Sequence, residues 1–312
     1  MRMKLQSNVC LALSLVCVLL VGASPVFAQP QSRPATPVTP VADVELVAQA
    51  SGRVARAVRV EDPPTLDGDV LGEAIWDDIV PATGFLQNTP DEGQPASERT
   101  EVRIIYTEDT VYFGIVCYVS DPSTIIVSDS RRDSSLNDTD SFQIIIDTYL
   151  DKQNGFLFGT NPAGLEYDGQ VTNEGQGGGR FGGGVVRRSG SQQQRGSGGG
   201  FNVNWDGVWQ VSAEISELGW TAEMAIPFKS LRYPSVGNQA HRWGFQITRS
   251  IRGKDETVVW APVSRGVSGF LPQMGLLDGM SGLSTSRNLE ILPTVTAVQV
   301  GTLDTTTGGP PP

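Results

Sequence analysis

The chain has 312 residues, a formal net charge of -11 and 39% hydrophobic residues. This length is enough for one large domain with its own apolar core. The acidic balance argues against nucleic-acid binding as the main activity, because that binding depends on clustered Lys and Arg.

Residues 1–28 have the pattern of a secretory signal peptide. Arg2 and Lys4 precede an apolar run over residues 9–21, and a small-residue cleavage site at residues 26–28 follows. The apolar run is too short to favour a membrane-spanning helix. We therefore expect an exported protein, located in the periplasm or outer membrane of a Gram-negative bacterium.

Two of the three cysteines, Cys10 and Cys17, lie inside this segment, so the exported chain keeps only Cys117. One cysteine forms no internal disulfide, and the fold must depend on its core. Together with one histidine, it also falls short of the three or four ligands of a usual zinc site. A lipoprotein cleaved at Cys17 fits less well, because Val16 is not a small residue.

After the signal, residues 29–54 are rich in Pro, Gln, Thr, Ala and Val, which predicts a disordered linker. Strand patterns then recur at short spacing over residues 55–283, separated by Asp, Gly, Asn and Pro. This organisation predicts one all-β domain, an antiparallel two-sheet β-sandwich of jelly-roll-like form.

The strands are predicted from alternating apolar positions and from the turns between them. Residues 141–149 are apolar on both faces, which places this strand in the middle of a sheet. Strands at 156–161 and 165–172 follow it. Three hairpins are also expected: 100–106 with 111–119, 209–215 with 220–226, and 243–251 with 257–263.

Two stretches interrupt the strand pattern. Leu71, Ala74 and Ile75 are spaced as on a helix, so residues 70–78 are expected to form a short helical element that plugs one end of the sandwich. Residues 175–200 are dominated by Gly, Arg, Ser and Gln, which bury too little apolar surface to become ordered. We expect a flexible insertion between two strands there.

No catalytic constellation stands out in the sequence. His241 is the only candidate base and lies in a polar turn, so we expect a histidine of a surface loop. Paired carboxylates suffice for glycoside hydrolysis, but the candidate acids are equally explained as turn residues or solvent-facing strand residues. They are Asp140, Asp147, Glu166, Asp168, Glu214 and Glu223. The protein is therefore expected not to be an enzyme.

Acidic and amide side chains gather just before the strand at 141–149. Within residues 129–140, Asp133, Asp138 and Asp140 offer the oxygen ligands that calcium prefers. The spacing differs from that of an EF-hand loop. The segment predicts either a structural calcium site or, as the favoured alternative, a polar loop capped by Asx turns.

Sugar recognition needs an aromatic ring that stacks on a pyranose face and polar groups that bind the surrounding hydroxyls. Trp205 and Trp209 lie just after the Gly-rich insertion, with Asn204 and Asp206 beside them. These four residues are candidates for contact with a polysaccharide or oligosaccharide. Tryptophans within alternating strands are expected in the core instead: Trp220, Trp243 and Trp260.

Several short motifs follow one another in order between about residue 60 and residue 280. They are residues 64–68 (Pro-Thr-Leu-Asp-Gly), 74–76 (Ala-Ile-Trp), 111–116 (Val-Tyr-Phe-Gly-Ile-Val), 139–147 (Thr-Asp-Ser-Phe-Gln-Ile-Ile-Ile-Asp) and 219–228 (Gly-Trp-Thr-Ala-Glu-Met-Ala-Ile-Pro-Phe). Together they resemble the family 9 carbohydrate-binding module, one of the DOMON-like β-sandwiches. The resemblance implies this fold and a sugar-binding ancestry.

Known members of that family are attached to xylan-degrading enzymes and hold a sugar end between two tryptophans. The resemblance fails at those positions, because the first falls near Asn137 and the second within residues 267–270. A polar side chain that contacts sugar in the family falls at Gln143, which therefore joins the candidate residues. Loss of the ring pair implies a different ligand or a loss of binding.

The end of the chain carries a second resemblance. Residues 287–293 (Arg-Asn-Leu-Glu-Ile-Leu-Pro), followed by residues 294–300, resemble the point where such modules lead into a large outer-membrane β-barrel of unknown function. We therefore expect residues 284–312 to be the start of a truncated C-terminal barrel domain.

Two functions remain open from the sequence. The first is non-catalytic carbohydrate binding that supports breakdown of xylan- or cellulose-type polysaccharide at the cell envelope. The second is a periplasmic accessory domain of an outer-membrane barrel, which contacts protein or peptidoglycan and binds no free sugar. The ordered motifs favour the first function, and the missing tryptophan pair favours the second.

Overall fold

The computed structural model describes residues 52–175, 200–202, 204–237, 239–264 and 266–283. Outside these residues lie the signal peptide predicted at 1–28, most of the linker predicted at 29–54, residues 176–199 of the predicted insertion and the barrel start predicted at 284–312. Within the described residues, no helix is long and apolar enough to cross a membrane.

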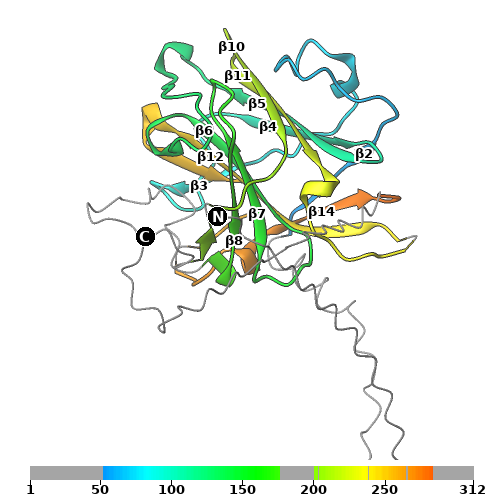
Figure 1. The fold of residues 1–312 in the computed structure, drawn as a ribbon. Helices are drawn as coiled ribbons and strands as arrows, with labels where there is room; N and C mark the ends of the chain where they lie inside the picture. Colours follow the sequence, from blue (N-terminus) through cyan, green and yellow to red (C-terminus); the bar gives the residue numbers. More distant parts are fainter. Residues whose placement is uncertain (1–51, 176–199, 203, 238, 265, 284–312) are drawn as a thin grey trace, which may run out of the picture. The chain divides into compact units, whose positions relative to one another are not determined.

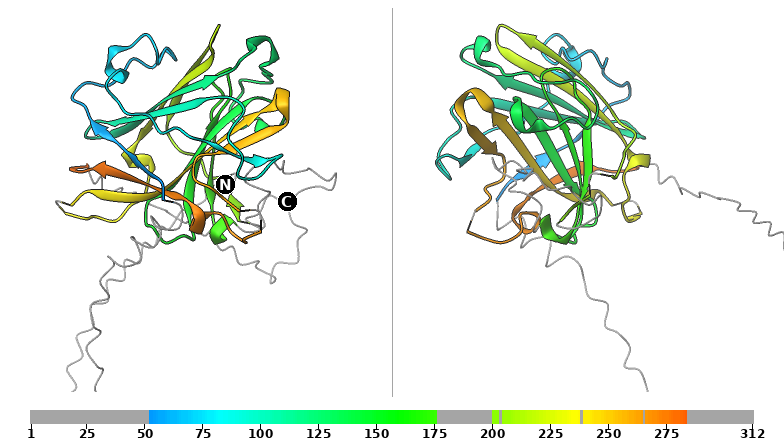
Figure 2. Two further views of the ribbon diagram at one scale, coloured as in Figure 1. Left: turned by 180° about the vertical axis from the view of Figure 1, so that it is seen from behind. Right: turned by 60° about the vertical axis from the view of Figure 1, so that its left-hand side comes forward.

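The described chain is an all-β sandwich of two sheets, as predicted (Figure 1, Figure 2). The larger sheet contains, in spatial order, β1 (Val54–Arg56), β14 (Gly275–Met280), β12 (His241–Ile251), β6 (Ser141–Asp147), β7 (Gly155–Thr160), β8 (Tyr167–Val171) and β9 (Phe201–Asn202); β13 (Glu256–Val259) pairs with β12, and β3 (Leu86–Thr89) with β13. The smaller sheet contains β10 (Gln210–Ser216), β11 (Gly219–Pro227), β5 (Thr110–Tyr118), β4 (Thr100–Tyr106) and β2 (Val58–Arg59).

The three predicted hairpins are confirmed, because β4 pairs with β5, β10 with β11 and β12 with β13, all antiparallel. The prediction of a wholly antiparallel fold is wrong at the N-terminus, where β1 pairs parallel with β14 and β2 parallel with β4. Only Ala57 separates these two short strands, so the chain passes there from one sheet to the other. Strands of two or three residues are too short to show an alternating pattern.

The core lies between the inner faces of the two sheets, because successive side chains of a strand point to opposite faces. The smaller sheet contributes residues such as Ile104, Phe113 and Met224, and the larger sheet residues such as Ile144, Phe158 and Phe245. The three tryptophans predicted in the core are confirmed there, with exposed fractions of at most 3%: Trp220, Trp243 and Trp260.

The predicted helical plug is wrong. Residues 70–78 contain only the 3-10 helix η1 (Ala74–Trp76), and Leu71 of the expected apolar face is 42% exposed. The residues that are buried are Val70, Trp76 and Ile79, and they cover the outer face of the smaller sheet rather than an end of the sandwich. Tertiary contacts of Trp76 therefore override the helical spacing.

The remaining helices among the described residues are also 3-10 helices of three residues each: η2 (Pro122–Thr124), η3 (Leu136–Asp138), η4 (Asn173–Gly175), η5 (Phe228–Ser230), η6 (Arg252–Lys254) and η7 (Leu271–Gln273). Residues around η7 form a third apolar cluster on the outer face of the larger sheet, where Phe270, Leu271 and Met274 pack on Ile145 and Leu157. Both sheets are thus covered on part of their outer faces.

Candidate functional site

Residues 204–209 connect the two sheets at one edge of the sandwich. They follow β9, the last strand of the larger sheet, and lead into β10, the edge strand of the smaller sheet. These residues belong to no strand. Their backbone polar groups therefore need partners other than a strand ladder.

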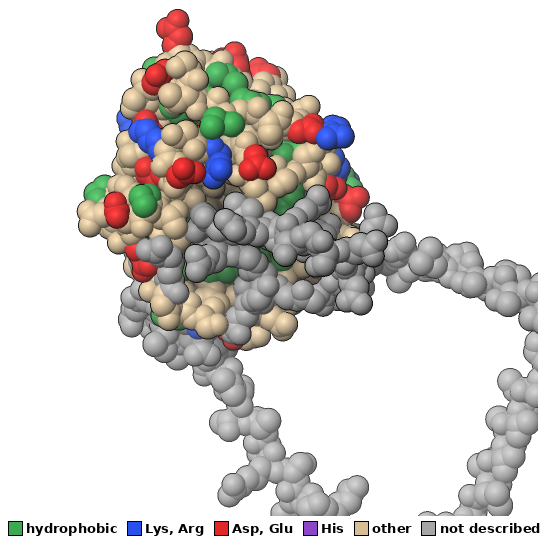
Figure 3. Space-filling view, turned by 90° about the vertical axis from the view of Figure 1, so that its left-hand side faces the viewer, with side chains coloured by type: hydrophobic (Ala, Val, Ile, Leu, Met, Phe, Trp, Pro, Cys, Tyr) green, Lys and Arg blue, Asp and Glu red, His purple; other side chains and the backbone are tan. Residues whose placement is uncertain are grey.

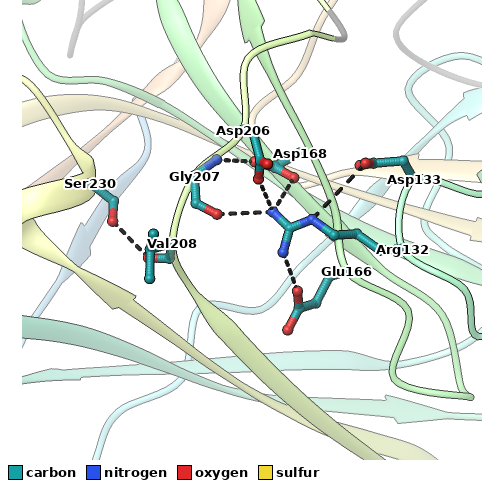
Figure 4. A network of polar contacts seen from close by, with 8 residues as sticks. All are labelled: Arg132, Asp133, Glu166, Asp168, Asp206, Gly207, Val208 and Ser230. Atoms are coloured by element: carbon teal, nitrogen blue, oxygen red, sulfur yellow. Dashed lines mark hydrogen bonds and ion pairs between the residues drawn. The ribbon is translucent and has the colours of Figure 1, made fainter.

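Side chains from three other parts of the chain supply those partners. Gly207 donates its N–H to Asp168 of β8, and its carbonyl accepts a hydrogen bond from Arg132 at 2.9 Å. The hydroxyl of Ser230, in η5, donates to the carbonyl of Val208 at 2.6 Å. The segment is thus held by contacts that are distant in sequence, as Figure 4 shows.

Arg132 is the centre of a network of carboxylates (Figure 4). Its guanidinium pairs with Glu166, with Asp206 and, at 3.0 Å, with Asp168, and its Nε lies 4.0 Å from Asp133. Burial alone would lower the pKa of Arg132, but the carboxylates outweigh burial and raise it. Burial raises the pKa of Asp168, against the opposing effect of its hydrogen bond from the backbone and of the guanidinium.

Trp205 lies directly beside this network. Its ring packs on Phe156 and Phe158 of β7, with ring centroids 5.0 and 5.8 Å apart. Both phenylalanines belong to the inner core, so Trp205 covers the end of that core at the sandwich edge. Trp205 is a partly exposed residue, whereas each of the other five tryptophans is at most 3% exposed. Trp205 is therefore the tryptophan that a ligand can reach.

The structure corrects the assignment of Trp209. This residue is 3% exposed and packs edge-on against Phe158 at 5.4 Å, so its ring is part of the core and offers no face to a sugar. Trp209, directly before β10, and Val211 and Ala213 within that strand alternate along the chain and pack on the same core. That period of two was the sequence signal for burial.

Asn204 and Asp206 lie where the sequence places them, on either side of Trp205. Both are exposed, and the backbone N–H of Asn204 donates to the side chain of Asn202. The carboxylate of Asp206 is 77% exposed even though it pairs with Arg132. These polar groups are available to hydroxyls of a ligand at the Trp205 ring.

Gln143 does not belong to this group, and its predicted partnership with Trp205 is wrong. In β6, Phe142 and Ile144 face the inner core, so Gln143 points to the outer face of the larger sheet. A side chain on Gly159 would meet both Gln143 and Leu136 there. Because Trp205 packs on the inner face, the sheet itself separates the two candidates.

The two ring positions of the family 9 resemblance also lie on this outer face. Leu136 precedes Asn137 and lies near Gln143, while Phe270 packs on Ile145 and Leu157. Phe270 is only 6% exposed. Neither position therefore presents an exposed aromatic ring, in keeping with the loss that the sequence implies.

The aspartates predicted as calcium ligands are not gathered. Among the described residues, no three or more His, Cys, Asp or Glu side chains form a group that could hold a metal ion. Asp140 is buried and accepts a hydrogen bond from the backbone of Ile126 at 2.6 Å, whereas Asp133 faces Arg132. Asp138 belongs to η3. The favoured alternative, a polar loop, fits this arrangement.

Several ionisable groups are buried rather than exposed, contrary to expectation. His241 begins β12, is 4% exposed and contacts Tyr233 and Trp243, and burial lowers its pKa. Asp147 accepts hydrogen bonds from three backbone N–H groups of the turn after β6, and Glu223 accepts from a second turn. These acids were expected as turn residues or solvent-facing strand residues. They are instead buried strand residues whose carboxylates accept hydrogen bonds from the backbone of turns.

Arg132, Asp168 and Ser230 belong to the site but were not predicted from the sequence as its members. Asp168 was considered only as a catalytic acid. Arg132 stands inside the stretch assigned to calcium, and this arginine among aspartates was the available signal for an ion-pair network. On the face drawn in Figure 3, basic side chains lie next to acidic ones.

No family model matches the chain, and no curated protein matches it either. Solved structures do. A family 9 carbohydrate-binding module from Caldicellulosiruptor kristjanssonii in complex with cellotriose is 14% identical, with a TM-score of 0.44, and the match covers 77% of this chain and 100% of that one. A family 9 module from the same organism in complex with glucose is 12% identical, with a TM-score of 0.46, and the match covers 76% of this chain and 100% of that one.

A proposed carbohydrate-binding protein from Bacteroides uniformis is similar at a TM-score of 0.51 and 13% identity, and the match covers 73% of this chain and 99% of that chain. This similarity shows the fold, a two-sheet β-sandwich shared with a protein to which sugar binding is ascribed. Function has to be argued from the site.

Proposed function

We propose that the chain is a non-catalytic carbohydrate-binding protein whose ligand, a polysaccharide or oligosaccharide, stacks on Trp205. One observation carries this proposal: of six tryptophans, only Trp205 reaches solvent, and it does so within a group of exposed polar side chains. An aromatic ring with carboxylate and amide neighbours is the chemistry that binds the faces and hydroxyls of a pyranose. Export and a role in breakdown of xylan- or cellulose-type polysaccharide at the cell envelope remain part of the proposal.

The test is retention on insoluble xylan and cellulose by the parent protein and by the Trp205→Ala variant. Removal of a stacking ring costs about 1 to 3 kcal/mol of binding free energy, so retention should weaken roughly fivefold or more. Tyr149→Ala is the matched control, because Tyr149 is an aromatic residue that is 54% exposed and lies outside the site. Its retention should equal that of the parent.

The outcomes separate the alternatives. If Trp205→Ala is retained as well as the parent, the site lies elsewhere. If the parent itself is not retained on any polysaccharide, the carbohydrate-binding proposal fails, and the accessory domain of an outer-membrane barrel becomes the better explanation. Circular dichroism must show that each variant keeps the parent's fold before its retention is compared with that of the parent.

A further inference from the structure

The position of Trp205 depends on the residues that follow it. Gly207 approaches the ring so closely that a Cβ atom on it would lie 2.8 Å from Trp205 Cη2. The ring therefore reaches over the backbone of Gly207, and a shift of that backbone must move the ring. Any group that fixes Gly207 also fixes the stacking surface.

Arg132 contacts this backbone and its neighbour at once. It donates to the carbonyl of Gly207 and pairs with Asp206, while Asp168, which receives the N–H of Gly207, is another of its partners. Both backbone polar groups of Gly207 thus meet Arg132 or its partner. The guanidinium can serve all of them because it presents five donors in one plane.

The carboxylates also need Arg132 to remain together. The side chain of Asp168 is 1% exposed, so its charge is weakly solvated. Glu166 and Asp206 are close to Asp168 because all three carboxylates pair with the same guanidinium. Without the cation, these like charges would repel each other in a place with little water. Asp206 is the most exposed of the three and is the one free to move outward.

We propose that Arg132 is the positioning residue of the Trp205 stacking surface. It acts through Gly207 and Asp206, and it joins the loop before β6 to the connection between the two sheets. Its role in ligand affinity rests on the proposed function, whereas its effect on the ring does not.

The experiment compares Arg132→Gln with Arg131→Gln. Arg131 is the adjacent arginine, its side chain is 84% exposed and it pairs with Asp129 outside the network. Because Trp205 is the solvent-reaching tryptophan, quenching of tryptophan fluorescence by acrylamide reports its exposure, and the Trp205→Phe background identifies its contribution. Acrylamide is neutral, so the loss of a positive charge does not itself alter quenching.

We expect Arg132→Gln to increase the quenching constant of the Trp205 component about twofold or more, since the ring loses its support. Affinity for an oligosaccharide should fall by roughly tenfold, comparable to the loss of a ring contact. Arg131→Gln should change neither value. Arg132→Lys should restore only part of both, because an ammonium group cannot match the planar fork.

Unchanged quenching in Arg132→Gln would overturn the proposal. Should this variant fail to fold, Asp206→Asn removes one exposed partner and should raise quenching by a smaller amount in the same direction. If the parent binds no sugar while Arg132→Gln still exposes Trp205, the positioning role stands and the proposed function fails. If the parent binds sugar, and Arg132→Gln and Arg131→Gln both bind it equally well with unchanged quenching, the positioning role fails while the proposed function stands.

Discussion

Two polar networks hold two irregular segments of this chain, one centred on the carboxylate of Glu223 and one on the guanidinium of Arg132. Under the turn at residues 66–68, Glu223 is 1% exposed and accepts hydrogen bonds from the backbone of Asp67 and Gly68 and from the indole of Trp76. At the sandwich edge, Arg132 instead gathers charged side chains, several of which reach solvent.

The difference separates scaffold from site. Glu223, Trp76 and Gly68 all belong to the motifs that carry the family 9 resemblance, and the structure brings those motifs together as a packing anchor on the outer face of the smaller sheet. Arg132 and Trp205 lie outside the motifs. The motifs of the resemblance therefore account for the scaffold, while the candidate site is built from residues outside those motifs.

The comparison predicts its largest effect at Trp76. This residue is 1% exposed, and Gly114 leaves room for its ring on β5. Trp76→Ala should lower the free energy of unfolding by about 3 to 5 kcal/mol, as for other large-to-small core substitutions. Denaturant unfolding would measure this effect, with Trp205→Ala as the comparison. A smaller loss for Trp76→Ala than for Trp205→Ala would contradict the division into scaffold and site.

A second effect concerns pH, because the buried carboxylate of Asp147 in the scaffold has no cation like Arg132 paired with it in the described structure. Burial raises the pKa of Asp147 from 3.8 to about 6, although backbone N–H groups oppose the shift. The folded state then holds this proton more tightly than the unfolded state. The contribution of this group to the free energy of unfolding should therefore fall as the pH rises from below about 4 to above about 6, by about 3 kcal/mol in all.

Asp147→Asn removes the titrating group and tests this prediction. The difference in unfolding free energy between the parent and this variant should change over that pH window and level off above it. Denaturant unfolding at several pH values measures the difference. A difference that stays constant from pH 4 to 7 would contradict the assignment of this pH dependence to Asp147.

The smallest expected effect compares two glycines. Gly68 has a φ of +98° and lies so that a Cβ atom would meet the backbone of Ala213 at 2.9 Å, whereas Gly207 faces the ring of Trp205. Gly68→Ala should lower the free energy of unfolding by about 1 to 3 kcal/mol. Gly207→Ala should instead weaken ligand binding and alter Trp205 quenching, with a smaller loss of stability. If Gly68→Ala weakened ligand binding more than Gly207→Ala did, the ligand site would lie at the Glu223 turn instead.

Much of the fold was predictable because alternation along a strand is a local property. The hairpin strands were found from apolar residues at every second position, and Trp220 and Trp243 were placed in the core for the same reason. The strand predicted at 141–149 was found from a continuous apolar run instead, and the structure has it as Ser141–Asp147. The helical expectation for residues 70–78 failed, because a short apolar spacing fits several conformations and contacts with a distant sheet decide among them.

By itself, the sequence predicted a β-sandwich, stacking candidates near residue 205 and no tryptophan pair at the positions of the family 9 resemblance. Only the tertiary structure decided that Gln143 faces away from Trp205, that Trp209 is buried and that Arg132 joins Asp168 and Asp206. The reason is physical. A strand's period assigns residues to two faces, but which face is inside, and which distant side chains meet at a sheet edge, depends on how the two sheets pack.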